Sequence, residues 1–273
     1  MPLRPLRLRC LQKRNYSTSP PSPPAPSASP ARWLTTTKAR LGKCITFGLT
    51  PSQLQSTSRI LGILGRDWRE LVAGREGFLT DRKRAGVLRR RVVWGEMDSM
   101  GHVNNVTYVR YAESARIEWA NQFAARSEDA KRREEWRRLW TPEGEGLILR
   151  SMRTDYKFPM TWPDHISVFH KLRSLPQADD NSFILDVMIL SELHQRPAAR
   201  CVEDIVVYDY RIARPVALPP FVHKAFAEAF EEQEQARRVN EKKIKEIDDA
   251  IRKLELGSWD REDAKEDFGS AGA

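Results

Sequence analysis

The sequence has few cysteines, and their spacing excludes the sites that cysteine usually builds. The three cysteines are Cys10, Cys44 and Cys201. None lies in a CxxC pair or at a Cys/His spacing that would hold zinc, so we predict neither a metal site nor disulfides. Cys201 lies in an apolar run and is expected to be a small buried side chain. No apolar run approaches the roughly 18 residues of a membrane helix, so we predict no membrane span.

Acidic residues are absent before Asp67, although the first 66 positions hold 11 Lys and Arg. The whole chain has 46 basic and 37 acidic residues, so residues 67–273 have 46 − 11 = 35 basic and 37 acidic ones, a net charge of −2. The positive excess therefore belongs to the N-terminal segment. This distribution argues against nucleic-acid binding by the rest of the chain.

The N-terminal segment has the composition of an organelle transit peptide, because it is rich in Arg and Ser and lacks acids. Leucines and basic residues are mixed from Leu3 to Arg14, and Arg14–Ser17 resembles a matrix processing site. We predict import into the mitochondrial matrix; the alternative is a disordered basic tail. The Pro/Ser-rich stretch 17–30 is expected to be disordered, and residues 1–44 are assigned to the transit peptide and linker.

The apolar pattern of the remaining chain predicts a helical extension, a sheet domain and a final helix. An amphipathic helix at 54–71 lies in an extension assigned to residues 45–86. The predicted core elements are a strand at 87–94, a helix at 106–125 and strands at 147–158, 165–175, 182–193 and 200–212.

This order predicts an α+β domain over residues 87–220, with a five-stranded antiparallel sheet that wraps one long helix and with extra helices at both ends. Consecutive strands joined by short turns are expected to pair with each other. Residues 221–273 are assigned to a C-terminal helix and a disordered tail from Gly257 on. The 3-4-3 apolar spacing near the end of that helix fits either a short coiled coil or docking on its own domain.

The segment Trp94–Arg116, with the sequence WGEMDSMGHVNNVTYVRYAESAR, joins the first strand to the long helix. It places two carboxylates (Glu96 and Asp98), an imidazole (His102) and two asparagines (Asn104 and Asn105) in a turn before the helix start. The first helical turn has unpaired N–H groups and a positive dipole end, which can hold a developing oxyanion. A nearby carboxylate can activate water or attack an acyl carbon. The same residue types are also common in turns and helix caps, so spacing alone leaves both interpretations open.

The same segment is similar to the signature of the 4-hydroxybenzoyl-CoA thioesterase-like group of hotdog-fold acyl-CoA thioesterases, and it resembles a fungal mitochondrial member. The matching residues are Asp98, Gly101, His102, Val103, Asn104, Asn105, Tyr108, Tyr111, Glu113 and Arg116. The resemblance implies a hotdog fold and hydrolysis of an acyl-CoA, with no cofactor besides the CoA of the substrate.

The resemblance also implies roles for individual residues. Asp98 matches the catalytic carboxylate, which acts as a nucleophile or as a general base for water. His102 resembles the residue that positions the carboxylate or the thioester, and the backbone N–H near Asn105 would donate to the oxyanion. Glu113 is either a second active-site carboxylate or an ion-pair partner of a neighbouring arginine.

In this group CoA phosphates meet cations on the strands and turns after the helix. The candidates here are His170, Lys171 and Arg173, since phosphate needs positive charge and N–H donors. The alternative is that these alternate strand positions simply face water. Hotdog domains usually pair their sheets, so a homodimer or homotetramer is expected.

The motif departs from related proteins at two positions, and two other functions stay open. Met100 stands where plant acyl-carrier-protein thioesterases have Asn, which argues against their amide-assisted mechanism. Glu96 stands where relatives often carry Asp. An acyl-carrier-protein substrate would need a basic docking surface. A non-catalytic assembly subunit of a mitochondrial complex is favoured only by the helices at both ends.

Overall fold

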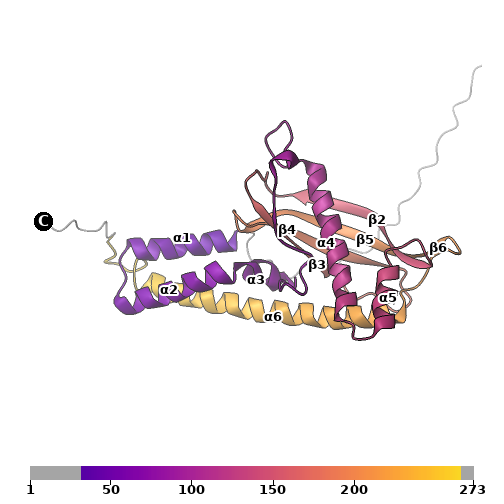
Figure 1. The fold of residues 1–273 in the computed structure, drawn as a ribbon. Helices are drawn as coiled ribbons and strands as arrows, with labels where there is room; N and C mark the ends of the chain where they lie inside the picture. Colours follow the sequence, from indigo (N-terminus) through magenta and orange to yellow (C-terminus); the bar gives the residue numbers. More distant parts are fainter. Residues whose placement is uncertain (1–31, 266–273) are drawn as a thin grey trace, which may run out of the picture. The chain divides into compact units, whose positions relative to one another are not determined.

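A six-stranded antiparallel sheet forms the centre of the structure, a computed structural model that describes residues 32–265. Its strands are β1 (Val87–Arg91), β2 (Glu145–Tyr156), β3 (His165–Leu172), β4 (Ser182–Ser191), β5 (Arg196–Asp209) and the short β6 (Arg214–Pro215). The helix α4 (Asn105–Arg126) packs against this sheet (Figure 1). This arrangement confirms the predicted hotdog fold class.

The strand order differs from the prediction at one place. The sheet runs β1-β3-β4-β5-β2, with β6 beside β5, so β2 pairs with β5 and not with the next strand, β3. The pairs β3–β4 and β4–β5 are antiparallel neighbours, as expected. The connection 157–164 can reach roughly 26 Å when extended. That exceeds the three strand spacings, about 14 Å, that it has to cross.

Alternating strand residues bury one face of the sheet against α4. One apolar cluster contains Tyr108 and Tyr111 from the first half of α4, together with residues of β3, β4 and β5. A second cluster contains Trp119 and Phe123 from the second half of α4. The start of α6 (Pro220–Leu256) belongs to this second cluster, because the ring of Phe226 contacts four other aromatic rings.

The remaining helices lie before this domain in sequence or, for one 3-10 helix and one α-helix, within it between β1 and β2. They are α1 (Trp33–Thr46), α2 (Pro51–Arg66), α3 (Trp68–Ala73), α5 (Ala130–Arg138) and the short 3-10 helices η1 (Gly74–Glu76) and η2 (Trp94–Glu96). The predicted helix 54–71 is therefore two helices that meet at Asp67. The first of the two, α2, begins at Pro51 and is preceded by a capping box. In it the side chains of Thr50 and Gln53 each accept the other residue's backbone N–H.

Two boundaries of the predicted terminal segments need correction. The assigned linker end at residue 44 falls inside α1, so residues 33–44 are helical and not disordered. At the other end, the chain continues in described turns beyond Gly257, where Ser258 is buried and bonds Leu254 O at 2.6 Å. Both segments are ordered by contacts that a local pattern does not reveal. The predicted processing site and the stretch 17–30 lie outside the described residues.

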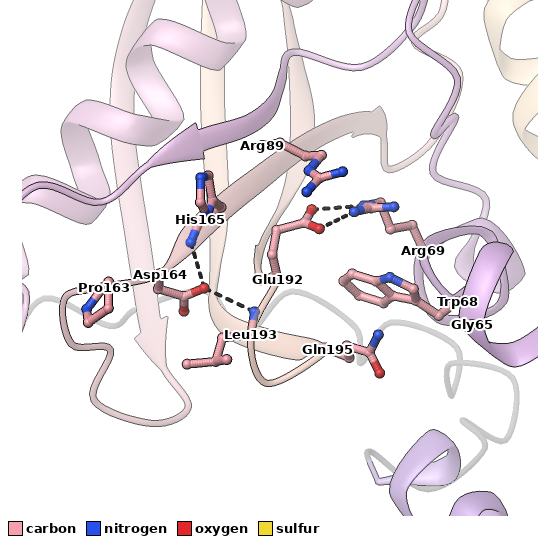
Figure 2. A pocket seen from close by; sticks show the side chains of 10 residues that line it. All are labelled: Gly65, Trp68, Arg69, Arg89, Pro163, Asp164, His165, Glu192, Leu193 and Gln195. Carbon is pink, nitrogen blue, oxygen red and sulfur yellow. Dashed lines mark hydrogen bonds and ion pairs between the residues drawn. The ribbon is translucent and has the colours of Figure 1, made fainter.

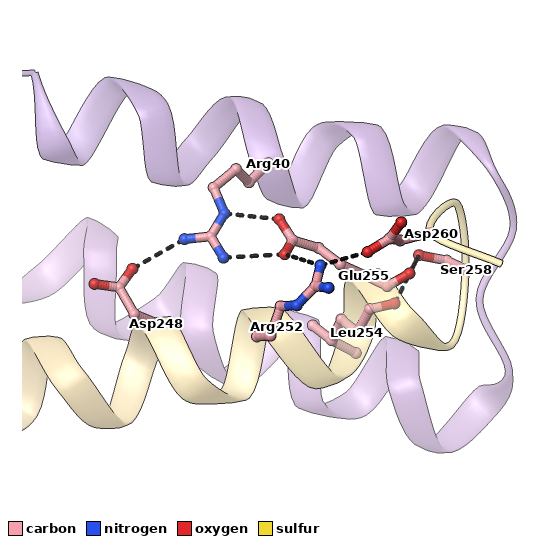
Figure 3. A network of polar contacts seen from close by, with 7 residues as sticks. All are labelled: Arg40, Asp248, Arg252, Leu254, Glu255, Ser258 and Asp260. Carbon is pink, nitrogen blue, oxygen red and sulfur yellow. Dashed lines mark hydrogen bonds and ion pairs between the residues drawn. The ribbon is translucent and has the colours of Figure 1, made fainter.

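The end of α6 is docked on its own chain, which decides between the two interpretations of its apolar spacing. Its four regularly spaced apolar residues are all buried: Ile244, Ile247, Ile251 and Leu254. Arg40 of α1 binds Glu255 of α6 through two hydrogen bonds of 2.7 and 3.1 Å, and Asp248 at 3.1 Å (Figure 3). These contacts lie within one compact unit that begins at Leu34. Among residues 32–265, no helix has the length and apolarity that a membrane crossing requires.

Candidate active site

A tight turn holds Asp98 between β1 and α4. The Asp98 N–H donates to His102 O at 2.9 Å, and the Gly101 N–H donates to Asp98 O at 3.0 Å. Gly101 has a φ of +73°, a conformation that side-chain-bearing residues rarely adopt. Asp98 Oδ1 accepts the Met100 N–H at 2.9 Å. Within the described part of the chain nothing donates to Asp98 Oδ2, so this oxygen is available to a substrate or to water.

The first turn of α4 presents one free backbone donor beside this turn. Asn104 is the N-cap, since its Oδ1 accepts the Val106 N–H at 2.9 Å and its carbonyl accepts the Thr107 N–H at 2.9 Å. No acceptor for the Asn105 N–H is found among the described residues. The Asn105 N–H therefore lies at the positive end of a 22-residue helix and has no hydrogen-bond acceptor within residues 32–265.

The connection from β2 to β3 forms hydrogen bonds with the Asp98 turn and with α4. The Val103 N–H donates to Met160 O at 2.8 Å, and the Trp162 N–H lies 3.2 Å from Met97 Sδ. The hydroxyl of Tyr108, buried in α4, accepts the Met160 N–H at 3.2 Å. The crossing connection that the sequence pattern did not predict is thus the segment on which the Asp98 turn rests.

The structure brings Asp98, His102 and the Asn105 N–H together but leaves Glu113 apart. His102 is half-buried, and its ring has no hydrogen bond within residues 32–265. Glu113 is exposed eight residues after Asn105, about 12 Å along the helix. It makes no ion pair with Arg116, which instead turns into the core.

The predicted phosphate-binding residues do not form one site. His170 is 2% exposed and faces α4, and this burial contradicts its assignment to a phosphate site. Lys171 and Arg173 lie on the opposite face of the sheet, because side chains alternate along a strand. There Lys171 Nζ donates to Glu76 O at 2.6 Å, and Arg173 Nε donates to Asp186 at 3.0 Å. Burial lowers the pKa of Lys171.

A buried charged group beneath α4 was missed by the sequence analysis. Arg116 Nη1 donates to Glu203 Oε1 at 2.7 Å, and His170 Nε2 lies 3.4 Å from Glu203 Oε2. Burial alone would raise the pKa of Glu203, but His170 and Arg116 together hold it below its usual value. The sequence feature that could have revealed this group is Glu203 itself, an acidic residue at an inward-facing position of an apolar strand, between Cys201 and Ile205.

A cleft of about 500 Å³ lies where α2 and α3 meet β1, β3 and β4 (Figure 2). Its lining residues are Gly65, Trp68, Arg69, Arg89, Pro163, Asp164, His165, Glu192, Leu193 and Gln195. Arg69 Nε donates to Glu192 at 2.8 Å, which ties the helical extension to the end of β4. Pro163 follows Trp162, so the cleft borders the connection that supports the Asp98 turn. The sequence pattern alone does not predict that the helical extension contacts this part of the domain.

Residues 92–226 match the family model of the thioesterase-like superfamily. Together with the fold, this match supports the class of a thioesterase-like hotdog domain. No curated protein sequence matches the chain significantly.

Three similar solved structures are from bacteria. The PA2801 protein from Pseudomonas aeruginosa is 23% identical, with a TM-score of 0.40, and the match covers 50% of this chain and 95% of that one. A thioesterase from Thermus thermophilus, complexed with coenzyme A and Zn, is 21% identical, with a TM-score of 0.41 and coverages of 54% and 96%. The DHNA-CoA thioesterase from Staphylococcus aureus is 14% identical, with a TM-score of 0.43 and coverages of 54% and 92%.

The buried Glu203 carboxylate makes stability dependent on pH. A carboxylate with a lowered pKa stabilises the fold above its unfolded pKa of about 4.3, and this contribution is lost as the pH falls through the folded pKa. We expect Glu203→Gln to lower the free energy of unfolding at pH 7 by about 3 kcal/mol, because Arg116 loses its buried partner. The variant should also lose less stability than the wild type as the pH falls below about 4.3, measured by urea unfolding.

Glu134→Gln is the matched control, because Glu134 is 53% exposed and pairs only with arginines of its own helix. Its unfolding free energy should change by less than about 0.5 kcal/mol. An equal effect of the two substitutions at pH 7 would contradict the stabilising role of Glu203.

Proposed function

We propose that this chain hydrolyses an acyl-CoA thioester, with Asp98 as the catalytic carboxylate. One observation carries the proposal. The same strand-to-helix turn presents a carboxylate oxygen of Asp98 without a donor and the Asn105 N–H without an acceptor, among the described residues. The match to the thioesterase-like superfamily supports thioester hydrolysis as the type of reaction. The choice of CoA follows from the likeness of the Trp94–Arg116 segment to acyl-CoA thioesterases.

The Asn105 N–H would donate to the thioester carbonyl oxygen and stabilise it as negative charge develops. Asp98 Oδ2 would then act in one of two ways. As a nucleophile, it attacks the acyl carbon, the carbon–sulfur bond breaks, CoA leaves as a thiolate, and water hydrolyses the resulting anhydride. As a general base, it takes a proton from a water molecule that attacks the same carbon. His102 lies in the same turn and would orient the carboxylate or the thioester.

Asp98→Asn should lower kcat for thioester hydrolysis by at least about 100-fold without changing the melting temperature, since the amide cannot act as nucleophile or base. The measurement is thiol release by the full chain from short, long and aromatic acyl-CoAs. Asp129→Asn is the matched control, because Asp129 Oδ1 accepts the Lys131 N–H at 2.9 Å in the same local pattern, at the start of α5.

Retention of more than about a tenth of the activity by Asp98→Asn would remove Asp98 from the chemistry. If the folded wild-type chain hydrolysed no acyl-CoA, the proposal of a CoA substrate would fail. Thioesters of an acyl carrier protein would then be the substrates to test. The non-catalytic alternative is not favoured, because both reactive groups of the turn are available.

We also propose that a second copy of the chain covers the Asp98 turn in a homodimer or homotetramer. Large apolar side chains around this turn are strongly exposed in the single chain: Trp94 at 71%, Met100 at 76%, and Val106 at 64%. A group of exposed apolar side chains of this kind usually marks an interface.

Light scattering coupled to size exclusion should therefore give the mass of a dimer or tetramer. The double substitution Trp94→Glu/Val106→Glu should convert it to a monomer, because two buried charges would oppose association. Leu54→Glu on α2, where Leu54 is 49% exposed, is the control and should leave the mass unchanged. A monomeric wild-type chain at micromolar concentration would refute this proposal.

For the cellular location we propose the mitochondrial matrix, as in a fungal-type mitochondrial member of the group. The support is the acid-free first 66 residues with their 11 basic side chains. Deleting residues 1–30 should leave the chain outside mitochondria in a fractionation experiment. Equal recovery of both forms in mitochondria would contradict a leader in this segment.

A further inference from the structure

The side chain of Glu96 is bound by donors from three directions. Glu96 Oε2 accepts the Tyr111 hydroxyl at 2.6 Å and the Val93 N–H at 3.0 Å, and Oε1 accepts Arg90 Nη2 at 2.9 Å. Arg90 lies on β1, Val93 precedes the Asp98 turn, and Tyr111 lies in the second turn of α4. One carboxylate therefore joins the strand, the loop and the helix.

The backbone of Glu96 makes a fourth connection. Its carbonyl accepts the N–H of Asn104, the N-cap of α4, at 2.9 Å. One residue further on, Met97 pairs with Val103 in an antiparallel bridge. The turn that carries Asp98 is thus closed at its base by Glu96 and Asn104, and the next residue after Asn104 supplies the free N–H.

The environment keeps this carboxylate charged and fixed. The Glu96 side chain is 14% exposed, whereas that of Arg90 is 46% exposed. The guanidinium of Arg90 also lies 4.6 Å from the centre of the Tyr111 ring, so the three side chains contact one another in a closed group. Burial raises the pKa of Glu96, but the donors Tyr111, Val93 and Arg90 outweigh it and the pKa is lowered.

We infer that Glu96 is a positioning residue for the hydrolysis proposed above, which holds the Asp98 carboxylate and the Asn105 N–H in a fixed relation. Both Glu96 oxygens are occupied by donors, so Glu96 takes no part in the chemistry itself. The inference rests on the proposed function for its catalytic consequence. Its structural part, that the Glu96 carboxylate orders the turn, stands independently.

Glu96→Gln tests this role because an amide has one acceptor oxygen for three donors and adds a donor of its own. At least one of the Tyr111, Val93 and Arg90 contacts is then lost. Glu96→Asp keeps both acceptor oxygens and the charge on a shorter side chain. Tyr111→Phe removes a single donor from the other side.

Glu255→Gln is the matched control. Glu255 also binds two arginines, Arg40 and Arg252, and its side chain is 6% exposed, but it lies at the end of α6. A loss of general stability would affect both variants, whereas loss of order in the Asp98 turn is expected only of Glu96→Gln.

The first measurement is hydrogen–deuterium exchange of the full chain at neutral pH, followed in peptides that cover residues 93–107. Exchange in this segment should be at least about tenfold faster in Glu96→Gln, because local opening becomes easier, and unchanged in Glu255→Gln. Tyr111→Phe should show a smaller increase in the same peptides.

The second measurement is thioester hydrolysis by the same variants. In Glu96→Gln kcat should fall by about 10- to 100-fold, because a small misplacement of the reacting groups is enough for this loss. KM should change by less than about threefold, since ground-state binding is retained. Glu96→Asp should restore most of the lost kcat.

Unchanged exchange of residues 93–107 in Glu96→Gln would overturn the inference, whatever the activity. Faster exchange with an unchanged kcat would overturn the positioning role, and so would an equal fall of kcat in Glu255→Gln. If the wild-type chain hydrolyses no thioester, the proposed function fails, while the exchange experiment still decides whether Glu96 orders the turn.

Discussion

The packing of α4 on the sheet is the constraint on which the rest of the structure depends. Tyr108 and Tyr111 of this helix are each only 2% exposed, and its small residues Ala112 and Ala115 are fully buried. Small side chains let the helix approach closely: a Cβ added to Gly86 would lie 2.5 Å from the Ala115 carbonyl oxygen. Because this packing fixes the helix axis, it also fixes where the first turn begins. The free Asn105 N–H and the Asp98 turn follow from that position.

Two carboxylates close together in sequence have different environments, and this difference separates their proposed roles. Among the residues that the structure describes, none donates to the second carboxylate oxygen of Asp98, as is required of a group that reacts with substrate or water. Glu96 is surrounded by three donors and has a lowered pKa, as suits a group that stays charged and holds other residues in place. A third carboxylate, Glu203, is enclosed beneath α4 and paired with Arg116. Environment, more than residue type, therefore assigns the function of each acid.

The helices outside the matched family segment are part of the same compact unit. Glu76 binds Arg200 of β5 through two hydrogen bonds of 2.7 Å, and its carbonyl accepts Lys171. Two cations on the outer face of the sheet, Lys171 and Arg200, thus bind a segment that precedes the domain in sequence. Lys171 and Arg173, chosen as phosphate ligands for their residue types, both have internal partners: Lys171 donates to the Glu76 carbonyl, whereas Arg173 binds Asp186 of β4. At the far end, Arg40 and Glu255 join α1 to α6 in the same way.

The sequence by itself determined the order of β1, α4 and the four long strands that follow, the start of α4 and the turn around Asp98, because periodicity and capping are local properties of the chain. It did not predict α1 or the short β6. Only the tertiary structure decided that β2 lies beside β5, since several strand orders bury the same alternating residues. It also decided the pairing of Arg116 with Glu203, which are 87 residues apart. His170 shows the limit of the sequence reading, because residue type suggested an exposed cation and the inward face of β3 buries it. Such contacts depend on which faces meet in space, and local patterns do not encode that.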